Sequence, residues 1–200
     1  DDVNMAQSTN DVCPTAIRIG GLMEIRKLLP TLENLEKEFI KKGKEFDQII
    51  KSGRTHLMDA VPVRLGQEFT AYGVNIRKHW KAIEQAAESS KELGIGGTAT
   101  GTGLNAHPKF RKMMADQLTK QTGINLRMAE DYFEAMQSLR PMVELSGAIR
   151  NLAQDLSRIS NDIRLLGSGP KTGLGEINKP GLERSICRPF SRVHPLCRAR

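Results

Sequence analysis

Apolar residues recur at steps of three and four along three long stretches of the chain, which is the spacing of one face of an α-helix. These stretches cover roughly residues 15–50, about 63–93 and about 130–166. A shorter pattern of the same kind fits a helix over 109–121. No stretch shows the alternation that is typical of a strand, so the sequence predicts an all-α fold built on long antiparallel helices.

The third stretch has the most regular pattern. From Met142 to Leu166 its apolar residues alternate steps of three and four without an interruption. So regular a seam is typical of a helix that packs against partner helices along its whole length. We expect this helix to start anew or to kink at Pro141, since proline disrupts a helix interior.

Composition and charge exclude several classes of protein. Only 38% of the 200 residues are hydrophobic, and no apolar run reaches the roughly 18 residues of a membrane span. The net charge is +7, but the segment 179–200 has six basic residues and one acidic residue, so it contributes +5 and residues 1–178 carry +2. The basic balance therefore gives no indication of a nucleic-acid-binding face.

Cysteine usage and the first residues bear on the compartment. Cys13, Cys187 and Cys197 show neither metal-ligand spacing nor an even disulfide framework. We therefore expect a reduced, cytoplasmic protein with no bound metal and no other cofactor. The chain opens on Asp1 without a methionine or a signal peptide, which is typical of the middle of a longer protein.

A polar, turn-forming segment separates the first two helical stretches and is the first candidate site. It reads Gly53-Arg-Thr-His-Leu-Met-Asp-Ala-Val-Pro-Val-Arg-Leu-Gly-Gln-Glu68. Connections that a rigid scaffold holds in place are where binding and catalytic groups concentrate. Thr55 and His56 stand side by side in it, and an imidazole can donate or accept a proton near neutral pH.

A second polar cluster, Ser8-Thr9-Asn10-Asp11, precedes the first helix and allows two interpretations. In the first, Asn10 or Asp11 caps the helix and Pro14 lies in its first turn. In the second, the free N–H groups at the helix start, together with hydroxyl and amide donors, bind a carboxylate.

The segment from Gly94 to Pro108 contains five glycines and three threonines, Thr98, Thr100 and Thr102, and cannot form a stable helix. It is a weak match to a phosphate-binding loop, because no Gly-Lys-Ser/Thr follows. Two interpretations remain, a loop whose N–H groups approach a small anion and a long flexible connection. His107, before Pro108, is expected to be a structural loop residue.

Four motifs in this order and spacing resemble the fumarase/aspartase superfamily over residues 1–178. They are Asn4-Met-Ala-Gln-Ser-Thr-Asn-Asp11, Gly53-Arg-Thr-His-Leu-Met-Asp-Ala-Val-Pro62, Gly97-Thr-Ala-Thr-Gly-Thr-Gly-Leu-Asn105 and Ser168-Gly-Pro-Lys-Thr-Gly-Leu-Gly-Glu-Ile-Asn178. The resemblance implies a homotetramer with a central helical bundle, in which three subunits build each active site. It also implies a small dicarboxylate substrate, from which fumarate forms by anti elimination.

The resemblance assigns roles to five residues. Ser8 and Thr9 are expected to donate hydroxyl hydrogen bonds to the substrate carboxylate that becomes doubly negative, and Asn10 to contact the leaving group. Thr55 is expected to bind substrate through its hydroxyl. His56 is the expected catalytic imidazole, which orients or assists the leaving group. The three threonines of the glycine-rich segment are expected to shape the site rather than to react.

The leaving group depends on which member of the superfamily the chain is most similar to. Thr9 and the segment Asp59–Glu68 favour aspartate ammonia-lyase, whereas Gly96-Gly97-Thr98 and His107-Pro108 favour class II fumarase. We expect ammonia and L-aspartate, with water and malate as the alternative. A different class of function is an inactive helical module that serves oligomerisation alone.

Two parts of the family pattern have no counterpart in the sequence, so we expect residues 1–178 to be a partial central domain, inactive alone. They are the N-terminal domain and the loop Gly-Ser-Ser-x-Met-Pro-x-Lys-x-Asn, which carries the serine base. The Arg-rich tail 179–200 stands in place of that loop and is expected to be disordered. Codons for Leu182–Arg200 can be chosen so that a one-base offset encodes such a serine loop. The hypothesis is that the tail is an out-of-frame translation.

Overall fold

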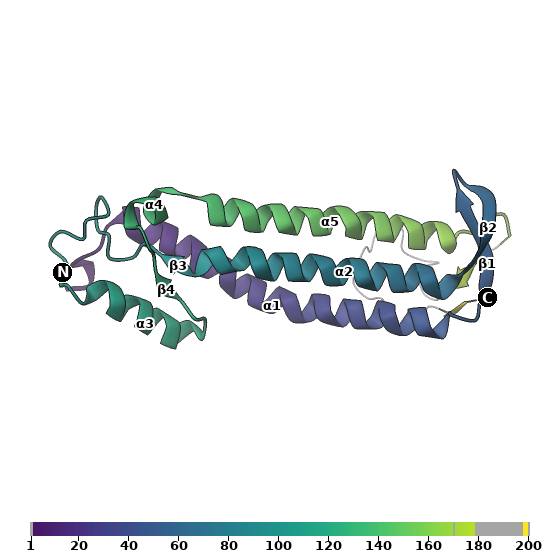
Figure 1. Ribbon diagram of the computed structural model, residues 1–200, viewed down its shortest axis with the longest axis horizontal. Coiled ribbons are helices and arrows are strands. Elements are labelled where there is room, and N and C mark those ends of the chain that lie inside the picture. The colour runs from purple at the N-terminus through teal and green to yellow at the C-terminus, as the bar shows by residue number, and fades with distance from the viewer. Residues whose placement is uncertain (1, 170, 179–197, 200) are drawn as a thin grey trace. The chain divides into compact units, whose positions relative to one another are not determined.

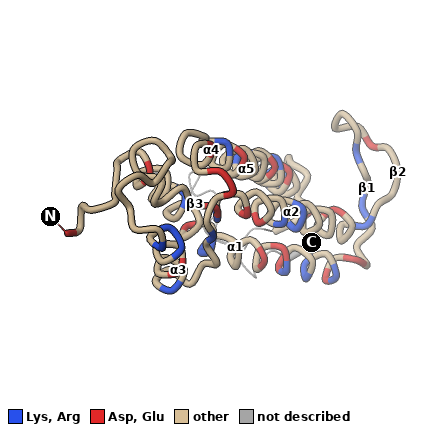
Figure 2. The backbone as a smooth tube through the Cα atoms, turned by 60° about the vertical axis from the view of Figure 1, so that its left-hand side comes forward, with Lys and Arg blue, Asp and Glu red and all other residues tan. Residues whose placement is uncertain are grey.

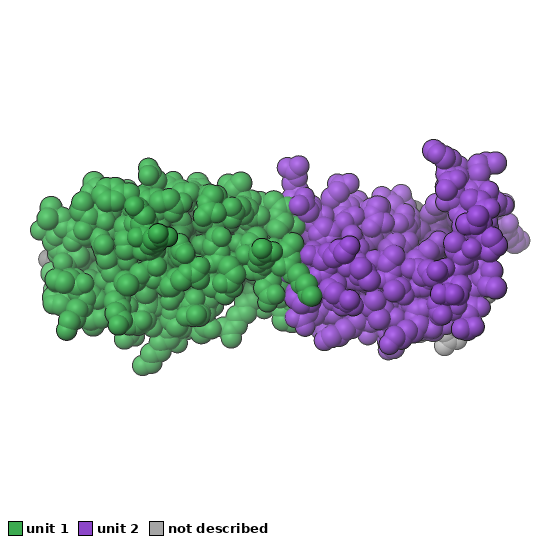
Figure 3. Space-filling model, in the orientation of Figure 1, with its two compact units in different colours: residues 1–30, 81–149 green, residues 31–80, 150–200 purple. Residues whose placement is uncertain are grey.

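The computed structural model describes residues 2–169, 171–178 and 198–199, which fall into two compact units. The first unit comprises 1–30 and 81–149, and the second comprises 31–80 and 150–200 (Figure 3). The predictions for the tail lie outside the described residues, except at Arg198 and Ala199, which form a short strand. No helix in the described ranges is long and apolar enough to cross a membrane.

Helices dominate both units, which confirms the predicted fold class (Figure 1). The longer elements are α1 (Thr9–Glu45), α2 (Leu65–Glu88), α3 (Phe110–Thr122), α4 (Tyr132–Gln137) and α5 (Arg140–Leu166). The helix expected over 130–166 starts anew close to Pro141, because α4 ends at Gln137 and α5 begins at Arg140. The shorter elements are η1 (Asp2–Asn4), η2 (Ser89–Lys91), β3 (Glu92–Leu93), β4 (Arg127–Met128), β5 (Ile177–Asn178) and β6 (Arg198–Ala199).

The absence of strands was predicted wrongly at residues 50–64, where β1 (Ile50–Thr55) and β2 (Met58–Arg64) form an antiparallel hairpin. β2 is largely exposed, and the only buried residue of β1 is Gly53, so neither strand shows the alternation of apolar and polar residues that reveals a half-buried strand. β2 also contains Pro62, which usually argues against a strand. The hairpin makes α1 end at Glu45 rather than near 50 and α2 begin at Leu65 rather than near 63.

Within the second unit, α1 and α2 run antiparallel (Figure 1), and a cluster of aromatic rings packs between them. Phe46 and Phe69 meet edge to face with ring centroids 5.1 Å apart, and Phe39 lies 5.7 Å from Tyr72 in the same geometry. Such pairs stabilise a core beyond their buried area. Burial raises the pKa of Tyr72, and nearby Asp162 raises it further.

Two glycines let the helices of the second unit approach closely. A Cβ at Gly66 would lie 2.2 Å from the carbonyl oxygen of Gly43 and 2.7 Å from the backbone nitrogen of Asp47. No side chain fits at that distance from backbone atoms. The start of α2 therefore packs directly against the end of α1, and this fixes the point from which the hairpin emerges.

The first unit has a buried arginine at its centre. Arg18, on α1, is 3% exposed and donates to the carbonyl oxygens of Glu92 at 2.5 Å, Ala135 at 2.9 Å and Ser138 at 3.2 Å. Burial lowers the pKa of its guanidinium. A buried cation must be hydrogen-bonded to be tolerated. Here it satisfies carbonyl groups next to β3 and at the end of α4, and thus ties both segments to α1.

The apolar seam of α5 is only half covered. Leu145, Leu152, Ile159 and Leu166 are buried, at intervals of seven residues. The alternate line is partly exposed and consists of Met142, Ile149, Leu156 and Ile163. Acidic and basic residues alternate along α1 (Figure 2). The seam of α5 thus has one line of apolar residues that is buried within the chain and one line that is partly exposed.

A polar cluster joins α2 to α5 within the second unit. Asp155 lies 2.6 Å from His79 Nε2, accepts from Asn75 Nδ2 at 2.9 Å and accepts from Arg158 Nε at 3.1 Å. The hydrogen bond with His79, followed by that from Asn75, holds the pKa of this carboxyl well below its usual range.

We predict that Leu152→Ala lowers the free energy of unfolding by about 2–5 kcal/mol, because it leaves a cavity at a position that is 4% exposed. The matched change Leu165→Ala, on the same helix but 43% exposed, should cost about 0.5 kcal/mol. Chemical denaturation followed by circular dichroism measures both. Equal losses would contradict the assignment of the buried line.

The Asp155 cluster predicts a pH dependence of stability. Its pKa is lower in the folded than in the unfolded chain, so its contribution is present above the unfolded value of about 4 and is lost as the pH falls towards the folded value. Asp155→Asn should therefore destabilise the protein at neutral pH, with a difference from the unmodified chain that shrinks in acid. Denaturant unfolding at several pH values tests this, and a difference that grows in acid would refute it.

Candidate active site

The helix α1 begins at Thr9, and Ser8 is the residue that caps it. The hydroxyl oxygen of Ser8 accepts from the backbone N–H of Asn10 at 3.2 Å, and the N–H of Ser8 donates to Asp11 Oδ1 at 2.9 Å. This reciprocal pair is a form of the capping box. The prediction that Asn10 or Asp11 caps the helix is therefore wrong, and Pro14 lies in the second turn rather than the first.

Asp11 also anchors the glycine-rich segment. Its second oxygen, Oδ2, accepts from the backbone N–H groups of Gly96 at 3.0 Å and Thr98 at 2.9 Å, and the residue is fully buried. A carboxylate that accepts three backbone hydrogen bonds is a strong, charge-assisted clamp. The small anion that the N–H groups of this segment approach is thus a side chain of the same protein.

The glycine-rich segment adopts an unusual backbone that several contacts hold in place. Gly96, Thr98, Gly101, Gly103 and Asn105 all have positive φ, and for a threonine this conformation is strained. Thr98 adopts it at φ 59°, where its N–H reaches Asp11.

Arg111, on α3, supports the same segment from the other side. It donates to the carbonyl oxygens of Gly96 at 3.1 Å and Gly101 at 2.9 Å, and its guanidinium lies 3.9 Å from the centre of the Tyr132 ring. Burial raises the pKa of Tyr132, while the charge of Arg111 opposes that shift. Of the two interpretations left open, the long flexible connection does not fit a segment held at so many points.

The clamp sets the direction of the Asn10 amide. Asn10 Nδ2 donates to the carbonyl oxygen of Ala99 at 2.8 Å, so Oδ1 is the end left to accept from a ligand. Thr9, Asn10 and Thr100 line a cavity of about 520 Å³, with Cys13, Ile17 and Met136 among its apolar walls. The arrangement offers hydroxyl donors, one amide acceptor and a helix N-terminus in one place, which suits a carboxylate next to a donor group.

Thr55 and His56 lie at the tip of the hairpin, in the second unit. His56 and Leu57 form the turn with φ of 52° and 62°, and both Thr55 and His56 are exposed. Two successive positive φ values are those of a type I′ turn, which usually requires Asn-Gly. Neither side chain makes a hydrogen bond to the part of the chain that the structure describes.

The five predicted residues therefore form two groups. Ser8, Thr9 and Asn10 lie together in the first unit, and Thr55 and His56 lie together in the second. His107, which is expected to be a structural loop residue, is exposed, and its Nδ1 accepts from the N–H of Lys109 just before α3.

Sequence reasoning missed the supporting residues. The Ser-x-x-Asp spacing of Ser8 and Asp11 is a capping-box signal that could have identified Asp11. The carbonyl contacts of Arg111 leave no comparable signal, since its partners precede it by ten and fifteen residues in an irregular segment.

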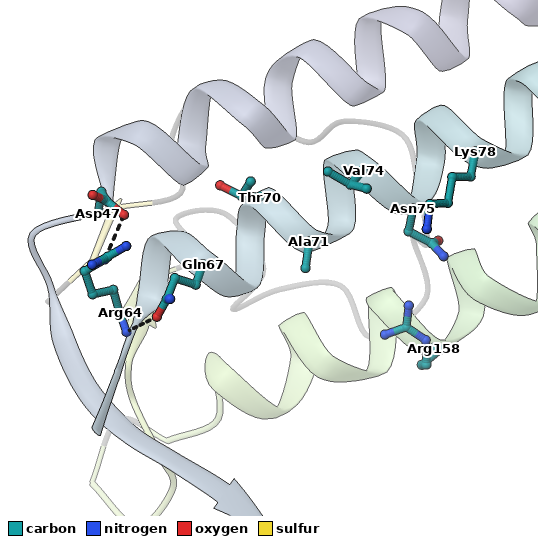
Figure 4. Close-up of a pocket in the computed structure, with 9 residues that line it drawn as sticks. All are labelled: Asp47, Arg64, Gln67, Thr70, Ala71, Val74, Asn75, Lys78 and Arg158. Atoms are coloured by element: carbon teal, nitrogen blue, oxygen red, sulfur yellow. Dashed lines mark hydrogen bonds and ion pairs between the residues drawn. The ribbon is translucent and has the colours of Figure 1, made fainter. Parts of the chain in front are cut away.

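A larger cavity in the second unit, of about 640 Å³, does not resemble a substrate site (Figure 4). Two of its basic residues already bind carboxylates. Arg64 Nε lies 3.0 Å from Asp47, and Arg158 contacts Asp155 and Asp162 at 3.1 and 3.2 Å. Over the described residues, no three His, Cys, Asp or Glu side chains are placed to hold a metal ion.

Comparison with known proteins identifies the family of the chain. A family model described as Lyase matches residues 1–185. The chain therefore belongs to this lyase family, within the fumarase/aspartase superfamily.

Named relatives come from both branches of the superfamily. The chain is 47% identical over 196 residues to "Fumarate hydratase class II" of Helicobacter pylori and 43% identical over 194 residues to "Aspartate ammonia-lyase" of Bacillus subtilis. The two matches include 98% and 97% of this chain, but only 42% and 41% of the length of the two relatives.

A solved structure is also similar, that of "fumarate lyase:delta crystallin from Brucella melitensis bound to cobalt". The TM-score is 0.88 at 43% identity, over 92% of this chain and 40% of that one. The chain thus spans about two fifths of the length of the proteins it matches.

We predict that Asp11→Asn lowers the free energy of unfolding by about 3 kcal/mol, because an amide cannot accept from N–H groups on both sides. Amide exchange of Gly96 and Thr98 should accelerate with it. Asp116→Asn, an exposed site on α3, is the matched control, with an expected loss of about 0.5 kcal/mol. Unchanged protection of Gly96 and Thr98 in Asp11→Asn would show that the clamp is not formed in solution.

Proposed function

We propose that this chain is the central part of an enzyme that eliminates ammonia from L-aspartate to give fumarate. The observation that carries the proposal is the group of Ser8, Thr9 and Asn10, fixed by the buried Asp11 carboxylate at the N-terminus of a 37-residue helix. Membership of the lyase family supports it.

The reaction needs stabilisation of negative charge at one place. A base removes the proton from the carbon next to a carboxylate, and the released electron pair makes that carboxylate doubly negative. The pair then forms the double bond as the C–N bond breaks and the nitrogen leaves with its electrons. The hydroxyls of Ser8 and Thr9, together with the positive end of α1, are proposed to hold the doubly negative carboxylate.

Asn10 and His56 are proposed to act on the leaving group. Because Asn10 Nδ2 is bound to Ala99, its Oδ1 can accept a hydrogen bond from the amino group of the substrate. His56 would assist departure by orienting the leaving group or by transferring a proton to it, and Thr55 would bind substrate beside it. Thr98 supports this site from the buried clamp and Thr100 from the cavity wall.

A complete site is proposed to require assembly of several copies of the whole protein. Thr55 and His56 point away from the described part of their own chain, and the alternate line of the α5 seam is partly exposed. Both features suit a homotetramer whose helices pack in one bundle, with His56 meeting the Ser8 group of another copy. Exposed apolar residues along a helix are typical of such interfaces.

Water is the second candidate for the leaving group, which would make malate the substrate. The relatives named fumarate hydratase class II support it, as do Gly96-Gly97-Thr98 and His107-Pro108. An inactive helical module is the candidate from another class.

The test uses the longest open reading frame that contains this chain. We expect fumarate, followed by its ultraviolet absorbance, to form from L-aspartate and not from malate. Formation from malate alone would select the second candidate. No fumarate from either substrate, in a preparation shown to be folded, would contradict the enzymatic proposal and favour the helical module.

In the same protein, His56→Asn should lower kcat/KM by about 10²–10⁴-fold, the usual contribution of general acid–base catalysis. The matched control is His107→Asn, whose imidazole only accepts a backbone N–H and whose loss should leave kcat/KM within about threefold. Similar losses in the two variants would remove His56 from the mechanism.

A further inference from the structure

A partly buried network of charged side chains lies at the base of the hairpin that carries His56. Lys51, on β1, is 9% exposed and pairs with Glu68 on α2 at 2.9 Å and with Glu176 at 2.5 Å. Arg54, also on β1, pairs with Glu176. The side chain of Glu176 is itself only 14% exposed.

Glu176 is fixed to the end of α5 through its backbone. Its N–H donates to the carbonyl oxygen of Leu166 at 2.9 Å, and the N–H of Gly175 donates to Ser168 at 2.7 Å. The segment after α5 therefore folds back on the helix end. Through the side chain of Glu176, that helix end is joined to β1, which is more than a hundred residues away in sequence.

The backbone conformation of the hairpin turn needs support from the residues around it. His56 and Leu57 both have positive φ, a conformation that non-glycine residues keep only when the surrounding structure imposes it. Arg54 directly precedes Thr55, stands opposite Asp59 in the strand register and pairs with it at 3.4 Å. Ser52 also donates to Asp59, at 2.8 Å. Polar contacts therefore connect Glu176, through Arg54, to Asp59 on the opposite strand, close to the turn.

We propose that Glu176 is a positioning residue, whose carboxylate between Lys51 and Arg54 holds the hairpin in the form that presents Thr55 and His56. The inference deepens the proposed function and rests on it for the role of the two presented side chains. Glu176 does not touch substrate in this scheme. Its charge acts through the two basic residues, because a partly buried Lys51 and Arg54 need a paired anion to stay in place.

The first experiment needs no activity. Hydrogen exchange of the backbone amides in β1 and β2 is measured in the purified 200-residue chain, alongside Glu176→Gln, Glu176→Asp and the control Glu24→Gln. Among the described residues, the exposed carboxylate of Glu24 pairs with neighbouring Lys27. Glu176→Gln should speed exchange in the hairpin about tenfold or more while amides in α1 and α2 keep their protection. Glu176→Asp and Glu24→Gln should leave the hairpin within about threefold.

Two results would overturn the proposal at this stage. One is hairpin exchange in Glu176→Gln that equals that of the unmodified chain. The other is an equal effect of Glu176→Asp, which retains the charge, because the charge would then not be what holds the hairpin. If Glu176→Gln unfolds the bundle, Arg54→Gln tests the same proposal. It removes the partner of Glu176 that lies nearest the turn and should likewise speed exchange in the hairpin.

The second experiment uses the longest open reading frame and the fumarate assay. Glu176→Gln should lower kcat/KM about tenfold or more, because both the substrate-binding Thr55 and the catalytic His56 lose their position, and Glu176→Asp should restore most of the loss. An equal loss in both variants would overturn the positioning role. If the unmodified enzyme forms no fumarate but Glu176→Gln still speeds exchange in the hairpin, the proposed function is contradicted. The role of Glu176 in holding the hairpin is then still supported.

Discussion

One buried carboxylate organises the first unit. Asp11 accepts from Ser8, Gly96 and Thr98, and so joins the start of α1 to a segment about 85 residues further along the chain. A buried charge is tolerated only when it is hydrogen-bonded in this way, so neither partner can move without exposing the other. Because the exposed residues Thr9 and Asn10 directly precede Asp11, the clamp also decides where they lie.

In the second unit, ion pairs rather than backbone hydrogen bonds hold the segment that carries the candidate site residues. Its hairpin has little buried surface and a turn of two non-glycine residues in the left-handed region. Ion pairs from Lys51 and Arg54 to Glu176 take the place of a hydrophobic face. The side chains of Thr55 and His56 at the tip of the hairpin are exposed and make no hydrogen bond to the described residues.

The two organising devices have a consequence for function. Each fixes one group of polar side chains, Ser8, Thr9 and Asn10 in the first unit and Thr55 and His56 in the second. The half-covered seam of α5 has the same character, since one line of apolar residues packs within the chain and the other is partly exposed. In the proposed function, both groups and the partly exposed line of the seam would meet where several copies of the protein associate.

The sequence alone determined the helices, because apolar spacing reports directly which residues face a core, and four motifs sufficed for the superfamily. It also pointed to Ser8, Thr9, Asn10, Thr55 and His56 as candidate site residues. Only the tertiary structure revealed the β1–β2 hairpin, since its strands show no alternation of apolar and polar residues. It also showed that Ser8 caps α1, because Ser8 takes that place only once Asp11 is buried. The partners of Asp11, Arg111 and Glu176 were beyond reach for the same reason, because contacts between distant segments depend on how the chain folds back and leave no local pattern.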